Sequence, residues 1–136
     1  MWYSYAVVRV VPRVERGEVL NVGVVLFSRE VDFLDVRVEV DEERLRSLAP
    51  GVDLATVERH LAIFRAVALG APEGGPIAAL PQPERFHWLV APRSTMIQTS
   101  PTHVGRSADP EVALEDLLSQ FVRAPREQAA VPRGAS

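Results

Sequence analysis

Alternation of apolar and polar positions dominates the first forty residues and predicts three strands. Residues 2–12 carry apolar side chains on both faces, which is typical of a central strand that is covered on both sides. Residues 19–28 form a second apolar run. Residues 31–40 alternate strictly between apolar and charged side chains, which indicates a half-exposed strand at or near a sheet edge. Short connections between these runs favour antiparallel pairing.

The register of the first two strands depends on the turn between them. A two-residue turn at Arg16-Gly17 pairs Arg9 with Val24, and a longer turn shifts this pairing by one or two residues. With the short turn, the apolar residues of the second strand that share the Arg9 face are Leu20, Val22, Val24 and Leu26.

Two helices are predicted after the strands. Asp41 is a suitable N-cap for a short helix over residues 42–48. Asp53 is a suitable N-cap for a longer helix over residues 54–69, in which apolar residues recur at three- and four-residue spacing. The longer helix is expected to end at Gly70, which can adopt the left-handed conformation of a C-cap.

The second half of the chain has weaker patterns. Residues 70–83 are rich in proline and glycine and predict a crossover or loop. Residues 86–90 and 95–99 are two short strand candidates, and Asp109-Pro110 is typical of a helix start. The tail from 124 to 136 is small and polar, and we expect it to be frayed.

The resulting order, βββααββα, predicts an α+β fold with a mainly antiparallel sheet and helices packed on one face. With 136 residues, the chain is long enough for one domain, which we place at residues 1–123, followed by a flexible tail.

Composition narrows the class of protein. The absence of cysteine excludes disulfides and thiolate chemistry, and no apolar run approaches the roughly 20 residues of a membrane helix. All 15 basic residues are arginine, for which high-GC codon usage is the default explanation and bidentate anion binding is the functional alternative. The formal net charge of −3 argues against nucleic acid as a partner. We expect a cytoplasmic bacterial protein that does not bind a membrane.

Two polar residues interrupt the apolar strands. Arg9 lies among valines and therefore needs a carboxylate, several carbonyls or a bound anion, unless it reaches solvent at a sheet end. Asn21 must be hydrogen-bonded if it is buried, either to a neighbouring turn or within a site.

The segment from Glu84 to Arg106 concentrates the remaining candidate chemistry. Arg93, Ser94 and Thr95 offer a guanidinium and two hydroxyls after a proline, a combination that holds phosphate or carboxylate, or that satisfies strand ends. Phe86 and Trp88 would share a strand face, where core packing or base stacking are the alternatives.

The histidines offer little further chemistry. His103 lies in an expected loop and is a weak candidate for a general acid or base, the alternative being simple exposure. It shows no metal-ligand spacing with His60 or His87, so we expect neither a metal nor another cofactor.

Four segments together resemble a known family: YSYAVVR at 3–9, GEVLNVGV at 17–24, ERFHWL at 84–89, and APRSTMIQTSPTH at 91–103. They are similar to the bacterial family catalogued as domain of unknown function 3037, over about residues 2–122. The resemblance implies a small cytoplasmic protein of uncharacterised activity, often encoded beside HipA-like kinases. The family pattern carries Arg9, Glu18, Asn21, Arg85, Arg93, Ser94, Thr95, Gln98 and His103, all present here.

Three functions are therefore open. The leading hypothesis is a non-enzymatic accessory or regulatory domain that binds a protein partner, for which the resemblance suggests a HipA-like kinase. The second is an anion-binding module for a phosphorylated small molecule or nucleic acid, whose one site would be lined by Arg9, Asn21, Arg85, Arg93, Ser94, Thr95 and Gln98. The third is a phosphate-ester hydrolase or phosphotransferase, with His103 as proton donor and Arg93 stabilising charge. A homo-oligomer is compatible with each.

Overall fold

The computed structural model describes residues 1–12, 18–93 and 95–123. Within this part, the strands are β1 (Trp2–Val10), β2 (Leu20–Ser28), β3 (Phe33–Val38), β4 (Ile97–Thr99) and β5 (His103–Arg106). The helices are α1 (Glu42–Leu48), α2 (Leu54–Leu69), η2 (Pro72–Ala79), α3 (Gln82–Val90), α4 (Pro110–Leu118) and η3 (Ser119–Arg123).

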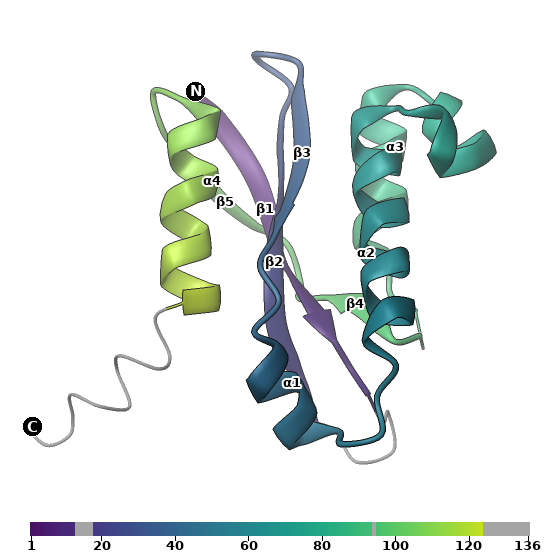
Figure 1. Cartoon of the computed structure of the whole chain (residues 1–136). Coiled ribbons are helices and arrows are strands. Elements are labelled where there is room, and N and C mark those ends of the chain that lie inside the picture. The colour runs from purple at the N-terminus through teal and green to yellow at the C-terminus, as the bar shows by residue number, and fades with distance from the viewer. Residues whose placement is uncertain (13–17, 94, 124–136) are drawn as a thin grey trace, which may run out of the picture.

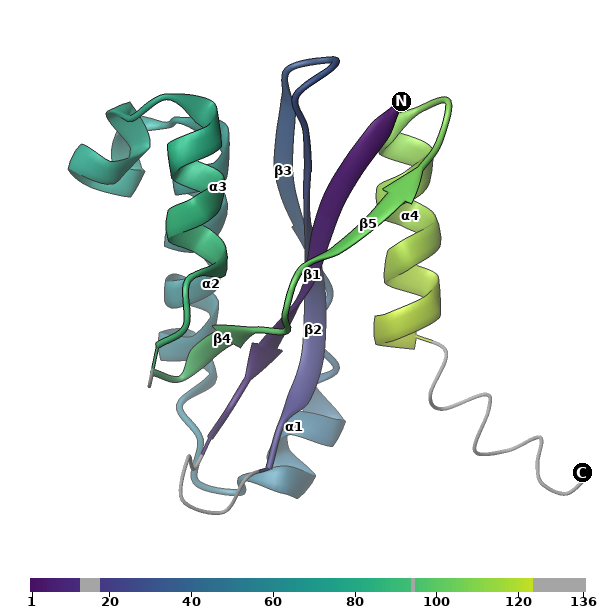
Figure 2. The same cartoon turned by 180° about the vertical axis from the view of Figure 1, so that it is seen from behind.

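The sheet is built around β1. Its order is β3-β2-β1, and both β4 and β5 pair with the other edge of β1, all of them antiparallel. Figure 2 shows β4 running toward the α3 side of the molecule and β5 toward the α4 side. The predicted α+β class with a mainly antiparallel sheet is confirmed, and β3 lies at the sheet edge as expected.

Helices lie on both sides of the sheet (Figure 1). Helices α2 and α3 cover one face, where Ala6, Val8 and Val10 of β1 enter the larger core. Helix α4 covers the other face, where Tyr3 and Tyr5 pack against a second cluster. Alternation along β1 explains both cores, because successive side chains of a strand point to opposite faces. The structure thus adds a second helical layer to the single one predicted, and we refer to the two as the α2-side core and the α4-side core.

A β-bulge changes the register at the end of the first hairpin. Val8 pairs with Gly23, but Arg9 pairs with Asn21, so that β2 contains one extra residue at this point. The pairing of Arg9 with Val24 was therefore wrong. Val24 and Leu26 do share the Arg9 face, whereas Leu20 and Val22 turn into the α2-side core.

The capped helices were predicted correctly. Asp53 accepts hydrogen bonds from the backbone N–H groups of Ala55 and Thr56, and Gly70 ends α2 with a φ of 71°. Asp41 caps α1 and Asp109 caps α4, each by accepting a backbone hydrogen bond. These helix ends are set by local side-chain chemistry, which explains why the sequence specifies them.

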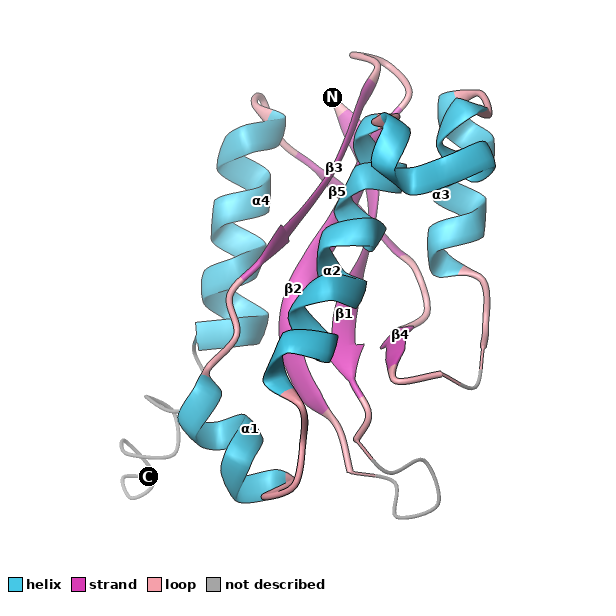
Figure 3. Cartoon of the chain, turned by 45° about the vertical axis from the view of Figure 1, so that its right-hand side comes forward, coloured by secondary structure: helices cyan, strands magenta, loops and turns pink. Residues whose placement is uncertain are grey.

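Residues 86–90 form part of α3, so the strand predicted there was wrong. Pro83 lies in the first turn of this helix, where its missing N–H has no cost, and Glu84 follows it. In the helix, Phe86 enters the α2-side core and stacks on Phe27 with ring centroids 5.1 Å apart. Trp88 is partly buried and packs against the same core. Figure 3 shows α2 and α3 lying next to each other on one side of the sheet.

Several sequence-based expectations fall on residues outside the described part of the chain. These are the hairpin turn at Arg16-Gly17, Ser94, and the tail 124–136. Among the described residues, every helix is too short or too polar to cross a bilayer.

Candidate functional site

A cavity of about 260 Å³ lies where α2, the C-terminal end of α3 and the segment before β4 meet. We call it the Arg93 pocket. The Arg93 guanidinium lies over the Trp88 ring, 4.4 Å from its centroid, and donates a hydrogen bond to the Trp88 carbonyl. The residues that line the pocket are His60, Ile63, Phe64, Trp88, Arg93, Thr95 and Ile97. The walls are thus mainly apolar, and a cation is fixed at one side.

The charge of Arg93 has no counterion among the described residues, since none of their carboxylates lies within ion-pair distance of it. Desolvation by burial lowers the pKa of Arg93 from its ordinary value. An arginine nevertheless stays protonated at neutral pH, because its ordinary pKa lies far above neutral. The pocket therefore presents a partly desolvated cation beside apolar walls, an arrangement that suits a group with an apolar body and an anionic end.

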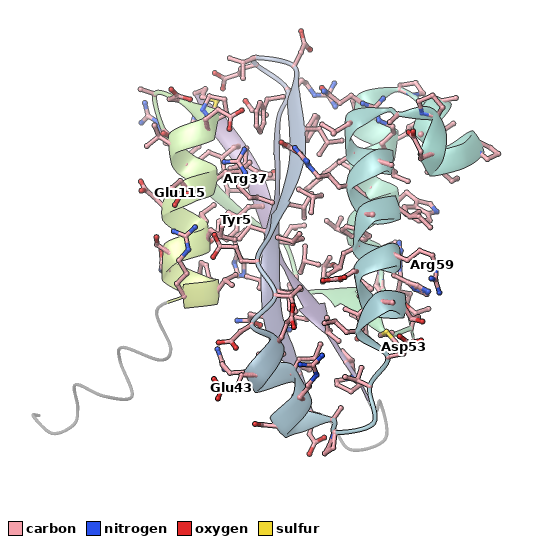
Figure 4. The ribbon with its side chains drawn as sticks, viewed as in Figure 1. Tyr5, Arg37, Glu43, Asp53, Arg59 and Glu115 are labelled. Carbon is pink, nitrogen blue, oxygen red and sulfur yellow. The ribbon has the colours of Figure 1, made fainter. Side chains whose placement is uncertain are left out.

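A second cavity, of about 500 Å³, continues this surface along α2. We call it the α2 groove, and its lining residues are Arg59, Ala62, Ile63, Arg65, Ala66, Leu69, Ala71 and Glu73. Ile63 lines both cavities, so the two adjoin at this side chain. Ile63 and Leu69 are 45% and 50% exposed. Figure 4 shows Arg59 on α2 pointing away from the sheet, toward the side that bears this surface.

Arg9, Asn21 and Gln98 form a row across three strands on the opposite face of the sheet. Arg9 is the cross-strand neighbour of Asn21 on β2 and of Gln98 on β4. Its strand neighbours Val8 and Val10 point into the α2-side core, so Arg9 points to the other face. Asn21 points to the same face, which α4 covers, because its Nδ2 donates a hydrogen bond to the carbonyl of Phe121, just beyond α4.

Arg9 makes none of the ion pairs described among residues 1–12, 18–93 and 95–123, so the structural salt bridge considered for it is not formed there. Among these same residues, the buried Nε of Arg9 has no hydrogen-bond acceptor. Asn21 makes the structural hydrogen bond that was one of its two alternatives, although to Phe121 and not to the neighbouring turn.

Arg85 lies neither in the Arg93 pocket nor beside Arg9, Asn21 and Gln98. Its guanidinium donates to the Leu80 carbonyl at 2.7 Å and to the Ala68 carbonyl at 3.3 Å. It thereby satisfies a carbonyl in the last turn of α2 and ties α3 to the segment that precedes it. The side chain is used in holding these elements together.

The structure accordingly does not bring the predicted ligand-binding residues into one pocket. Arg93 and Thr95 line the Arg93 pocket, and the Thr95 hydroxyl donates to the Ile97 carbonyl. The row with Arg9 lies on the opposite face, and Arg85 lies at the junction of α2 and α3.

His103 also lies apart from Arg93. It is on β5 opposite Tyr5, and their rings are 5.4 Å apart, on the α4 side of the sheet. A proton donor at His103 and charge stabilisation by Arg93 would therefore act on opposite faces. In the described part of the chain, no group of three or more His, Asp and Glu side chains is arranged to hold a metal ion.

Two residues that line the Arg93 pocket, Trp88 and Ile63, were not among the site residues predicted from the sequence. Trp88 was assigned to a strand, which concealed its position near the C-terminal end of α3, beside Arg93. Ile63 could have been noticed, because it falls off the apolar stripe of α2 that contains Leu61 and Phe64. An apolar residue outside the core-facing stripe is a signal of a second contact surface.

These features define an α+β protein with an open antiparallel sheet, helices on both faces, and an arginine-bearing apolar surface on one of them. A family model described as Protein of unknown function (DUF3037) matches residues 5–122, and the chain belongs to this family. No curated protein and no solved structure matches the sequence.

Proposed function

We propose that this protein is a non-enzymatic binding module that docks a protein partner on the α2 groove and the Arg93 pocket. The observation that carries the proposal is that the two cavities adjoin at Ile63, which lines both of them. Single exposed apolar side chains are ordinary on a protein surface, but a contiguous apolar surface that contains a cation is typical of an interaction site.

The charges around this surface indicate that its partner carries acidic residues. Arg59 and Arg65 line the groove, and Arg93 and His60 line the pocket, whereas Glu73 is the one acidic lining residue of the two cavities. Arg65 is already paired with Asp35, at 3.1 Å. The remaining basic groups suit an acidic segment, whose charges would also steer its approach.

The size of the pocket favours a side chain over a cofactor. About 260 Å³ lies below the usual range of small-molecule sites, which is roughly 300–1,000 Å³. We therefore propose that an apolar side chain next to a carboxylate occupies the Arg93 pocket, while further apolar residues of the partner contact Ile63 and Leu69. An aromatic and an arginine at the centre of such a surface are the residue types that dominate binding energy.

The family resemblance suggests a HipA-like kinase as this partner, and the test uses one encoded beside the gene. Both proteins are co-expressed, purified through a tag on the kinase, and examined by size-exclusion chromatography at micromolar concentration. We expect a complex that contains both chains. If the chains elute separately at this concentration, the proposal of a kinase partner is wrong.

A matched pair of variants tests the surface itself. Ile63→Arg places a charge at the point where the cavities meet, and we expect it to prevent co-elution. Val31→Arg introduces the same group at an exposed valine between β2 and β3, where Val31 is 48% exposed, and should leave the complex intact. Equal binding by both variants would place the interface elsewhere.

A further inference from the structure

We infer that Arg9, with Asn21 and Gln98 on either side, forms a second binding site, specific for a small oxyanion, on the α4 face of the sheet. We call these three residues the Arg9 row. The oxyanion would be a carboxylate or a phosphoryl group, since both present two coplanar oxygens to a guanidinium fork. This site goes beyond the proposed partner surface and does not depend on it.

The first argument is the incomplete satisfaction of Arg9. Its Nε–H is buried and donates to no acceptor, and its terminal nitrogens make no hydrogen bond or ion pair with the described residues. Nearly all buried polar groups in folded proteins have a partner, so an exception requires a physical reason. Arg85 Nε is also buried without an acceptor, but the terminal nitrogens of Arg85 donate to two carbonyls, whereas those of Arg9 donate to none of the described residues. A ligand that supplies the missing acceptors is a physical reason for the state of Arg9.

The second argument is the placement of the row. Neighbouring strands lie about 4.8 Å apart, so the side chains of Asn21 and Gln98 flank Arg9 on a span of roughly 10 Å. Each amide already donates one N–H to a carbonyl, Asn21 to Phe121 and Gln98 to Thr95. An amide NH₂ group has two N–H bonds, so each retains one donor for an anion held by Arg9.

The third argument is positional rigidity. Arg9 is held in the centre of the sheet, with strands on both sides of β1, and the neighbouring amides are anchored by the hydrogen bonds just described. Sites built on strands hold their geometry more closely than sites on loops. The anchored amides of Asn21 and Gln98 therefore lose less side-chain entropy on binding than free surface amides would.

The probes for this site are sodium phosphate and sodium acetate, added at constant ionic strength so that general screening does not change. The readout is the ¹H–¹⁵N signal of the Arg9 Nε–H, which is observable because a buried N–H exchanges slowly with water. We expect a saturable shift of this signal in the millimolar range. The anion that binds more tightly identifies the ligand as a phosphoryl compound or a carboxylate.

Three variants give the proposal a second readout, the melting temperature with and without phosphate. Phosphate should raise the melting temperature of the wild type and of Arg106→Met, whose guanidinium lies over the Trp2 ring at the other end of β1. It should not raise that of Arg9→Met. Arg9→Lys keeps the charge but not the fork, and we expect it to lose most of the effect.

Two results would overturn the inference. One is a linear, non-saturating drift of the Arg9 signal with both anions up to tens of millimolar. The other is an equal rise in melting temperature for the wild type and Arg9→Met. Because neither experiment involves a protein partner, both outcomes are independent of whether the kinase binds.

Discussion

At the scale of single residues, the buried and unsatisfied Nε–H of Arg9 lowers the stability of the fold, and the same group is the centre of the proposed oxyanion site. The sequence alone marks it as anomalous, since a guanidinium among valines must find acceptors. The sequence could not show which acceptors it finds, because its neighbours Asn21 and Gln98 come from other strands. Asn21 lies beside Arg9 because of the bulge in β2, and Gln98 lies beside it because β4, far along the chain, pairs with β1. Neither feature can be recognised in the sequence around Arg9.

Replacing Arg9 with methionine should stabilise the protein in buffer that contains no phosphate or carboxylate. An unsatisfied buried donor costs about 1–3 kcal/mol, and methionine fills similar volume without a donor. Because only Nε is buried, we expect a gain of about 1 kcal/mol, near the lower end of that range. Urea denaturation measures it through the transition midpoint.

The control is Arg106→Met. The Arg106 guanidinium lies 4.8 Å from the Trp2 ring centroid, so its removal gives up a favourable contact and should not stabilise the protein. If Arg9→Met instead destabilises by several kcal/mol, Arg9 has a strong internal partner, as in a broken buried ion pair, where the loss is about 3–5 kcal/mol.

At the scale of elements, the helices whose ends are fixed by local chemistry were the predictable ones. Helix α2 has the boundaries that Asp53 and Gly70 indicate. Helix α3 was mistaken for a strand because a run of five residues such as 86–90 is too short for its periodicity to separate the two structures. Strand β5 was missed because its residues form a strand only through pairing with β1.

The N-cap of α2 should make stability depend on pH. The Thr56 hydroxyl, followed by the backbone N–H of Thr56, donates to Asp53 and lowers the pKa of its carboxyl. A carboxyl with a lowered folded-state pKa stabilises the protein above its unfolded pKa, near 3.9, and this stabilisation is lost as pH falls through the folded value. The difference in melting temperature between wild type and Asp53→Asn should therefore shrink from about pH 5 to about pH 2.

Thr56→Val tests the cause of this dependence. The Thr56 Oγ1 lies 2.8 Å from Asp53 Oδ2, and valine keeps the shape but not the donor. When Thr56→Val is present in both proteins of the comparison, the effect of Asp53→Asn on the melting temperature should vary less with pH. A melting-temperature difference between wild type and Asp53→Asn that stays constant over the whole pH range would contradict the assignment.

The pairing of β2 with β3 depends on the absence of a side chain at Gly23. A Cβ at this position would lie 2.5 Å from the Arg37 carbonyl oxygen and 2.8 Å from Val38 Cγ1. The Arg37 carbonyl oxygen belongs to the backbone and cannot move aside as the end of a flexible side chain can. Gly23→Ala should therefore lower the unfolding free energy by about 1–3 kcal/mol. Gly51→Ala is the control, because a Cβ at Gly51 meets nothing within 4 Å. Equal stability of the two variants in urea would show that β3 shifts freely.

At the scale of the whole molecule, the sheet separates two surfaces that the sequence could not separate. Arg93 and Arg9 were expected to line one site, and the structure places them on opposite faces. The side of Arg9 is decided by alternation along β1, because its neighbours Val8 and Val10 both enter the α2-side core. Helix α4 was predicted, but the pattern of its apolar residues could not say which face of the sheet it covers.

The two cores should nevertheless unfold as one unit, because each consists of opposite faces of the same strands. Leu89 of α3 and Leu118 of α4 are 1% and 0% exposed, on the α2 side and the α4 side. We expect Leu89→Ala and Leu118→Ala each to lower the unfolding free energy by about 2–5 kcal/mol. Circular dichroism and tryptophan fluorescence should give coincident urea transitions for both variants, as a two-state domain requires.

Val112→Ala provides the reference for α4, since Val112 is 51% exposed and its truncation should change stability little. A loss below about 1 kcal/mol for Leu118→Ala would mean that α4 packs loosely and that the α4-side core contributes little. Separate transitions for the two probes would mean that the faces unfold independently. Coincident transitions with a large loss would instead establish that the α4 layer, and with it the support of the Arg9 row, belongs to the cooperative fold.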